Sequence, residues 1–351
     1  MRIPKMRYKI FALVAVCAFV LNGISASFAQ TKTTVQTREL AALLPASDGV
    51  ISLDVQKLLS EAVPQILSGK PQMLGDITSK IDELRDKTGL DARQFEQIVI
   101  GVATRQITAR EVDLEPVFLA RGKYNANALI AVAKLASKGK YREERIGNRA
   151  VYVFTGKDII AQNKPQTKNS WFDRMIDRTI NSLTKEIAVT SLDGNTLAFG
   201  SLARVRETFE TKTRVSGEVL SLLNRKPNAV VSFGASLPNG LSKFIDLDND
   251  ELGRTLDSIR QMSGALEVFA NNATFSLAAK TLQPDQAQTL HETLEGLQML
   301  GKAFIGAGRG EDKKVFARMI DNARITRSGA EVALDLQVPQ SDINILLVGV
   351  K

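Results

Sequence analysis

The chain has 351 residues, of which 44% are hydrophobic and 24% are charged, and its 46 basic and 38 acidic side chains give a formal net charge of +8. This composition is typical of one or two globular domains. Because the chain contains one cysteine, Cys17, and one histidine, His291, zinc sites built from several cysteines and histidines are excluded, and a Ser-His-Asp site would have to use His291. Carboxylate chemistry and oxygen-ligated Ca²⁺ or Mg²⁺ remain open.

Residues 1–29 have the layout of a secretory signal peptide. Four basic residues and no acidic one precede an apolar run from Ile10 to Leu21, and the small residues Ser27 and Ala29 stand three and one positions before the expected cut. We therefore expect an exported protein, periplasmic or extracellular after cleavage. The mature chain would keep 42 basic and 38 acidic residues, and this mild surplus gives no support for nucleic-acid binding. It would contain no cysteine and hence no disulfide.

Two alternatives for the leader stay open. Its apolar run is shorter than the roughly 20 residues of a membrane-spanning helix, but a basic flank can hold a marginal span as an uncleaved anchor. The protein would contact a membrane only in that case. Lipidation of Cys17 is the second alternative, although Val16 stands where a small residue normally precedes a lipidated cysteine.

After an N-terminal linker at residues 30–46, several segments in the first part of the chain resemble segments in the second part. We expect a first α+β repeat at 47–215, with an insertion at 156–183, and a second repeat at 216–351. Self-similarity of this kind is typical of duplicated supersecondary units. The alternative is two unrelated stretches that resemble each other by chance. The matched segments are 49–53 with 229–233, 98–100 with 266–269, 117–120 with 275–278, and 150–154 with 331–335.

Each repeat is predicted to run strand, helix, strand, strand, helix, strand, strand. Runs of β-branched residues ended by turn signals at Asp193-Gly194-Asn195 and Ser328-Gly329 predict strands. Apolar spacing predicts helices, two of which should begin near Asn125 and Pro284. We therefore predict an α+β fold of two tandem ferredoxin-like (split βαβ) repeats, with antiparallel sheets and helices mainly on one face.

The insertion at 156–183 distinguishes the first repeat from the second. It begins with a polar loop and continues with the spacing of an amphipathic helix, which contains the only tryptophan of the chain. Aromatic and methionine side chains are enriched at interface hot spots, so we predict a contact with a protein partner. The alternative is ordinary packing of this helix on the sheet. The candidate partner-binding residues are Trp171, Phe172, Met175, Ile176 and Ile180.

A basic cluster surrounds Tyr141. It is a candidate surface for anions such as an envelope polysaccharide, a lipid phosphate or an acidic protein. Glu143 and Glu144 dilute the charge, so the alternative is a solvated helix end and strand edge, where lysine discourages pairing. The candidate anion-contacting residues are Lys138, Lys140, Arg142 and Arg145.

Alternating carboxylates at 246–251 resemble the ligand spacing of a calcium-binding loop. Glu251, however, stands where such a loop needs glycine for its sharp turn. The alternative is an acidic start at Asp250 of a helix running through Leu256 and Ile259, which the helix dipole favours. The candidate Ca²⁺ ligands are Asp246, Asp248, Asp250 and Asp257; we expect no other cofactor.

Two further features point away from catalysis. His291 lies on a predicted helix, and the sequence has no G-x-S-x-G elbow to supply a nucleophile beside it, so we expect it at the surface or at a boundary. Gly306, Gly308 and Gly310 follow a helix rather than a strand and are not joined to a Gly-Lys-Ser/Thr motif, so they predict a loop and not a phosphate site.

The function best supported by the sequence is an exported, non-enzymatic binding or scaffolding protein of the cell envelope. An enzyme using two carboxylates, such as a glycan hydrolase, is the alternative. A protein anchored in the membrane by a retained leader is the third hypothesis. The sequence gives no prediction of the oligomeric state.

Overall fold

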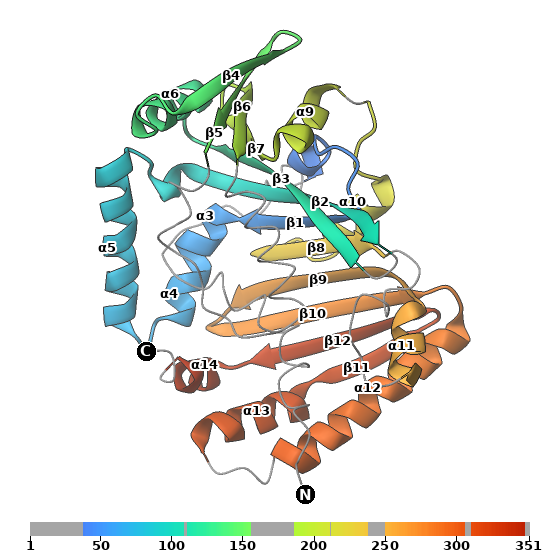
Figure 1. Cartoon of the computed structure of the whole chain (residues 1–351). Helices are drawn as coiled ribbons and strands as arrows, with labels where there is room; N and C mark the ends of the chain where they lie inside the picture. Colours follow the sequence, from blue (N-terminus) through green and yellow to red (C-terminus); the bar gives the residue numbers. More distant parts are fainter. Residues whose placement is uncertain are drawn as a thin grey trace, which may run out of the picture.

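A computed structural model describes residues 38–108, 111–155, 186–210, 212–237, 250–305 and 310–347. In this part of the chain, twelve strands form one sheet in the order β11-β12-β10-β9-β8-β1-β2-β3-β7-β6-β5-β4. Figure 1 shows this sheet running through the whole molecule. The strands are β1 Gly49–Asp54, β2 Phe95–Thr108, β3 Glu111–Gly122, β4 Tyr141–Ile146, β5 Arg149–Phe154, β6 Ile187–Asp193, β7 Thr196–Gly200, β8 Val231–Ser236, β9 Ile259–Phe269, β10 Asn272–Thr281, β11 Arg324–Ser328 and β12 Glu331–Val338.

Two of the helices begin at residues whose side chains cap them. Asn125 accepts a hydrogen bond from the backbone N–H of Ala128, and Ser216 does the same for Val219, which satisfies donors that a helix start leaves open. The helices are α3 Val55–Lys57, α4 Val63–Ile66, α5 Pro71–Thr88, α6 Ala126–Ala136, α9 Leu202–Glu210, α10 Gly217–Leu223, α11 Asp250–Asp257, α12 Pro284–Ile305, α13 Glu311–Asn322 and α14 Gln340–Leu346, together with the π-turn η2 Leu58–Ala62 and the 3₁₀ turn η3 Ala92–Gln94.

The two halves of the chain meet in the middle of the sheet. β1 pairs antiparallel with β8, so that Ile51 lies opposite Phe233, and each of the two strands continues into a meander, β1-β2-β3 or β8-β9-β10. The α+β class with a large antiparallel sheet is therefore as predicted. The split βαβ order is not confirmed: such a unit separates two parallel strands that a helix joins, whereas β1 and β2, joined by helices, pair directly and antiparallel.

Three of the four matched pairs of segments lie in strands that occupy equivalent positions in the two meanders. Residues 49–53 and 229–233 contribute to β1 and β8, 98–100 and 266–269 to β2 and β9, and 117–120 and 275–278 to β3 and β10. The fourth match does not, because β12 pairs with β10 whereas β5 pairs with β4 and β6. The strand that pairs with β3 is β7. Strand periodicity predicts that a strand forms and does not specify its partner.

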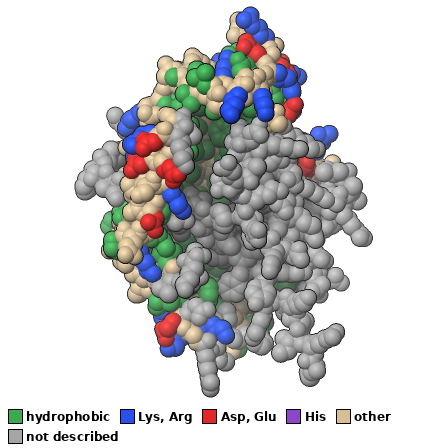
Figure 2. Space-filling model, turned by 60° about the vertical axis from the view of Figure 1, so that its left-hand side comes forward, with side chains coloured by type: hydrophobic (Ala, Val, Ile, Leu, Met, Phe, Trp, Pro, Cys, Tyr) green, Lys and Arg blue, Asp and Glu red, His purple; other side chains and the backbone are tan. Residues whose placement is uncertain are grey.

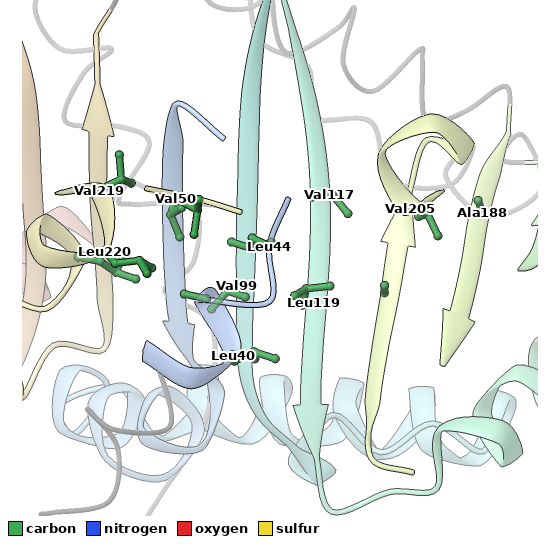
Figure 3. Packing of buried hydrophobic residues seen from close by; sticks show 14 of the residues in the cluster. Leu40, Leu44, Val50, Val99, Val117, Leu119, Ala188, Val205, Val219 and Leu220 are labelled. Carbon is green, nitrogen blue, oxygen red and sulfur yellow. The ribbon is translucent and has the colours of Figure 1, made fainter. Parts of the chain in front are cut away.

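One face of the sheet, called here the α10 face, is covered by α9, α10 and the segment preceding β1. Figure 3 shows Leu40 and Leu44 of that segment lying over Val50 and Val99, and all four side chains are buried. A glycine in β8 allows α10 to approach closely, since a Cβ at Gly234 would lie 2.7 Å from Leu222 Cβ.

The opposite face, called the α6 face, carries α3, α4, α5, α6, α11, α12, α13 and α14 around its margin, as Figure 1 shows. Three buried clusters hold these helices. α6 packs through Ile130 near Leu197. The turn η2 and the helices α4, α5 and α14 pack around Leu266, and α12 packs through Leu290 near Val332. Among the residues that the structure describes, no helix combines the length and apolarity needed to cross a membrane.

Candidate binding surface

A row of apolar side chains crosses the middle of the α6 face. Opposite residues of neighbouring strands share a face, so the pairing register places these side chains side by side from β7 to β10. Gly264 of β9 lies within the row and adds no side chain. The central row consists of Phe199, Phe118, Ile100, Ile51, Phe233 and Leu277.

Side chains of neighbouring strands are in direct contact at both ends of the row. The rings of Phe118 and Phe199 stack with centroids 4.8 Å apart. At the other end the Phe233 ring lies over Gly264, where a Cβ would come within 2.3 Å of Phe233 Cε1 and 2.8 Å of Leu277 Cδ2. The glycine therefore makes the space that the Phe233 ring occupies.

The central row lies outside the four buried clusters of the described residues. All six of its side chains are partly exposed. The clusters on the α6 face begin one residue pair to either side. Leu53 and Leu266 belong to the cluster formed with η2, α4, α5 and α14, and Met262 packs against the cluster formed with α12. The row thus forms an apolar band between helices that pack on its two flanks.

The chemistry of the central row suits one kind of contact. Its side chains are hydrocarbon only and carry no hydrogen-bond donor or acceptor. The strand backbones beneath them are paired on both sides. An apolar band of this kind favours a hydrocarbon surface whose own polar groups are already satisfied, and it offers nothing to a polar substrate.

The insertion leaves the sheet at one point and returns to the same point. Phe154 at the end of β5 lies opposite Ile187 at the start of β6. The predicted partner-binding residues Trp171, Phe172, Met175, Ile176 and Ile180 lie between these two positions, outside the described residues.

The predicted anion-contacting residues lie on and beside the β4–β5 hairpin. Arg142 donates hydrogen bonds to Glu186 and Glu144, and the bond from Arg142 holds the pKa of Glu186 below its usual range. Lys138, Lys140 and Arg145 are exposed. Figure 2 shows basic and acidic side chains intermixed at this end of the molecule. The cluster gathers both signs of charge and not a single cationic surface.

The predicted calcium ligands fall partly outside the described residues. Asp246 and Asp248 lie there, whereas Asp250 begins α11 and Asp257 ends it. Ile259 was expected to continue this helix but is the first residue of β9, where it pairs with Thr281. Within the part of the chain that the structure describes, no three acidic, histidine or cysteine side chains come together as metal ligands. Calcium binding stays a prediction.

His291 lies on α12 and is one-fifth exposed. Its Nδ1 is 3.5 Å from a carboxylate oxygen of Glu295, one helical turn later. This is the boundary position expected from the sequence.

Two buried titratable groups, Asp54 and Tyr124, form hydrogen bonds that stabilise the fold. Asp54 ends β1 and accepts a hydrogen bond from the backbone N–H of Lys57, but burial raises the pKa of its carboxyl above the usual value. Burial likewise raises the pKa of Tyr124, whose hydroxyl donates to the carbonyl of Ala120. Both groups hold an element to the sheet.

No family model matches the chain, and no curated protein matches it. Solved structures of TP0453 are similar in outline: crystal form IV is 10% identical over 90% of this chain and 99% of the other, with a TM-score of 0.41. Crystal form I is 9% identical over 92% and 97%, with a TM-score of 0.40. A likeness of this degree implies no function.

Proposed function

We propose that the chain is an exported, non-enzymatic binding or scaffolding protein of the cell envelope, with the insertion at 156–183 as its contact element. The sheet would be the rigid frame, and a protein of the envelope would be the partner. The layout of residues 1–29 supports export.

The opposition of Phe154 and Ile187 carries this proposal. Because these two residues face each other in the β5–β6 ladder, the 32 residues between them form an excursion from a hairpin end. The β5–β6 ladder reaches this pair without any of these residues. Loops held on a rigid scaffold are common sites of binding.

We further propose that the two halves are copies of one unit, of which only the first acquired the insertion. Each half has a three-stranded meander, then a helix or helices, then a hairpin with one strand beside the meander. The β4–β5 hairpin and the excursion are additions to the first half. Duplication supports a scaffolding role because the second copy doubles the frame without repeating the contact element.

A turn replacement tests the contact role. Residues 155–186 are replaced by Asn-Gly, the pair that best closes a two-residue hairpin between Phe154 and Ile187. Both forms are crosslinked in intact cells, and the crosslinked peptides are identified by mass spectrometry. We expect the variant to keep the far-ultraviolet circular dichroism of the frame and to lose a partner that the full chain captures through 156–183. A folded variant that keeps the same partner would exclude the insertion as the contact element.

The mass of the cellular protein tests export. Cleavage after Ala29 gives a mature form that begins at Gln30 and fractionates outside the cytoplasm. A full-length form in the membrane fraction would instead establish the retained leader as an anchor.

A further inference from the structure

We propose that Tyr141 and Tyr152 form a binding site for a quaternary ammonium group, and that Lys134 occupies this site until such a group displaces it. The two tyrosines lie on the neighbouring strands β4 and β5, and Lys134 lies in the last turn of α6. Figure 1 shows α6 beside the β4–β5 hairpin at one end of the sheet. This proposal does not depend on the contact role of the insertion.

The ammonium group of Lys134 lies over the faces of both rings. Its Nζ is 3.5 Å from the ring centroid of Tyr152 and 5.3 Å from that of Tyr141, within the roughly 6 Å over which an aromatic face attracts a cation. The two centroids are 6.1 Å apart, and the ring planes meet at 73°. These distances place Nζ at the corner of a nearly right-angled triangle, so the rings form two walls around a cation.

Neighbouring side chains hold the two walls in place. The register puts Tyr141 opposite Phe154, and their ring centroids are 5.8 Å apart. Phe154 is buried, and Tyr152 packs against the cluster that holds α6 to the sheet. The rings therefore have a fixed arrangement within the fold, which lowers the ordering cost of binding a ligand.

A carboxylate lies beside the two rings. Glu143 is exposed, lies directly opposite Tyr152 in the β4–β5 ladder, and shares a sheet face with Tyr141. Arg145 shares this face too, but it lies one pair further along, opposite Ala150. By register the acidic side chain is the closer of the two to the rings, and it favours a cation there.

The site suits a quaternary ammonium group better than the ammonium of a lysine. A lysine ammonium has three N–H donors and is strongly hydrated, and the ring faces give these donors no strong acceptor. A quaternary ammonium has no N–H donor to satisfy, and aromatic walls recognise it through its charge. Lys134 and both tyrosines are partly exposed, so a solute can reach the rings.

Lys134 has a favourable position to move to. Because it lies in the last turn of α6, its ammonium can turn towards water and the helix end, whose partial negative charge stabilises a cation. Its flexible four-carbon stem allows this movement without a change of the backbone. While the lysine is in place it competes with a ligand, and it lowers the apparent affinity by the fraction of molecules whose site is open.

Choline tests the site in the mature protein, residues 30–351, whose tyrosines are Tyr124, Tyr141 and Tyr152. With isotope-labelled tyrosine rings, choline should shift the NMR signals of Tyr141 and Tyr152 until the site is saturated. The signal of Tyr124, whose hydroxyl donates to the carbonyl of Ala120, should not move. The neutral analogue of choline with carbon in place of nitrogen should leave all three signals unchanged, because recognition depends on the charge.

Four variants separate the roles of the side chains. Lys134→Ala should strengthen choline binding on the order of tenfold, because no resident cation competes. Lys140→Ala, the control, removes the same charge from an exposed lysine next to Tyr141 and should change the affinity little. Tyr152→Phe keeps the aromatic face and should retain binding, whereas Tyr152→Leu should abolish the shift of Tyr141. If circular dichroism shows that Tyr152→Leu does not fold, Tyr141→Leu on the edge strand replaces it, with Tyr152 as the signal.

The proposal fails if choline shifts neither Tyr141 nor Tyr152 in the folded Lys134→Ala protein. Equal shifts by the neutral analogue would also overturn it, because they would reveal an apolar contact and not a cation site. Equal affinities of Lys134→Ala and Lys140→Ala would show that Lys134 does not occupy the site.

Two sources present a quaternary ammonium group: a free solute such as choline and the headgroup of phosphatidylcholine. Sedimentation with vesicles of phosphatidylcholine, compared with vesicles of phosphatidylglycerol, distinguishes them. Selective sedimentation that Tyr152→Leu abolishes would assign the headgroup, and protein that binds choline but stays in solution would assign the free solute. Either result supports the site, and the absence of both interactions would overturn it.

Discussion

The rings of Phe118 and Phe199 lie parallel, with centroids 4.8 Å apart and an interplanar angle of 4°, although the two residues are 81 positions apart in the chain. This contact links β3 to β7 at one end of the central row. Both rings belong to the first half of the chain. The energy of their contact therefore contributes to the attachment of the outer strands of that half to the meander β1-β2-β3.

A double-mutant cycle at Phe118 and Phe199 should reveal this coupling. Each single change to alanine should lower the free energy of unfolding by about 1–3 kcal/mol, below the cost at a fully buried site because both rings are partly exposed. The double variant should cost less than the sum, by about 0.5–1.5 kcal/mol, since the pair interaction is lost only once. Urea unfolding gives the four energies, and strict additivity would show that the stacking adds nothing to burial.

Local signals in the sequence predicted the elements well. Turn residues at Asp193-Gly194-Asn195 separate β6 from β7, and Asn125 and Pro284 stand at helix starts. Each of these positions acts through its own backbone geometry or hydrogen bonding, which depends on neighbours in the chain. Such features can be read without knowing the fold.

The central row could not be predicted in the same way. The sequence places apolar residues at Ile51 and Phe233 within strands, but the two positions are 182 apart and become neighbours only through the pairing of β1 with β8. The same holds for β7, which lies beside β3 as β12 lies beside β10, although the sequence comparison matched β12 with β5. Pairing between distant strands depends on the competition among all edges, and a single sequence does not record it.

Two glycines should respond in opposite ways to alanine. A Cβ at Gly122 would lie 2.1 Å from the carbonyl oxygen of Gln94, a backbone atom that cannot move aside alone, so Gly122→Ala should destabilise by more than 2 kcal/mol, on the order of other overpacked sites. Gly75, inside α5, has nothing within 4 Å of its Cβ position. Gly75→Ala should stabilise by about 1 kcal/mol because alanine restricts the unfolded chain and favours the helix.

Thermal unfolding of the two variants measures this contrast. A stable Gly122→Ala protein would mean that η3 and the end of β3 separate without cost, in conflict with the hydrogen bond from Lys123 to the same Gln94 carbonyl.

Asp54 should make stability fall as pH rises through the acidic range. Its folded pKa is raised by burial, so the folded state holds the proton more tightly than the unfolded state. The stabilisation that protonation gives is fully present below the unfolded pKa, near 3.9, and is lost as pH rises through the folded pKa. Asp54→Asn keeps an oxygen that can accept from Lys57 and removes the charge.

The stability of Asp54→Asn relative to the parent should therefore increase from pH 3 to pH 7, with little difference at the acid end. Urea midpoints at several pH values provide the measurement. A parent protein that gains stability over this range relative to Asp54→Asn would contradict the burial argument.

Loss of Arg318 alone should destabilise the protein chiefly because the Asp342 carboxylate would stay buried without its cation. Arg318 of α13 donates through Nε and Nη2 to the Asp342 carboxylate, which is 5% exposed at the first turn of α14. Arg318→Met leaves that carboxylate buried without its cation and should lower the unfolding midpoint. Arg318→Met with Asp342→Leu removes both charges and should recover part of the loss, because no unpaired buried charge remains. Midpoints that rank the double variant below Arg318→Met would show instead that Asp342 stabilises α14 by itself, through its place near the helix start.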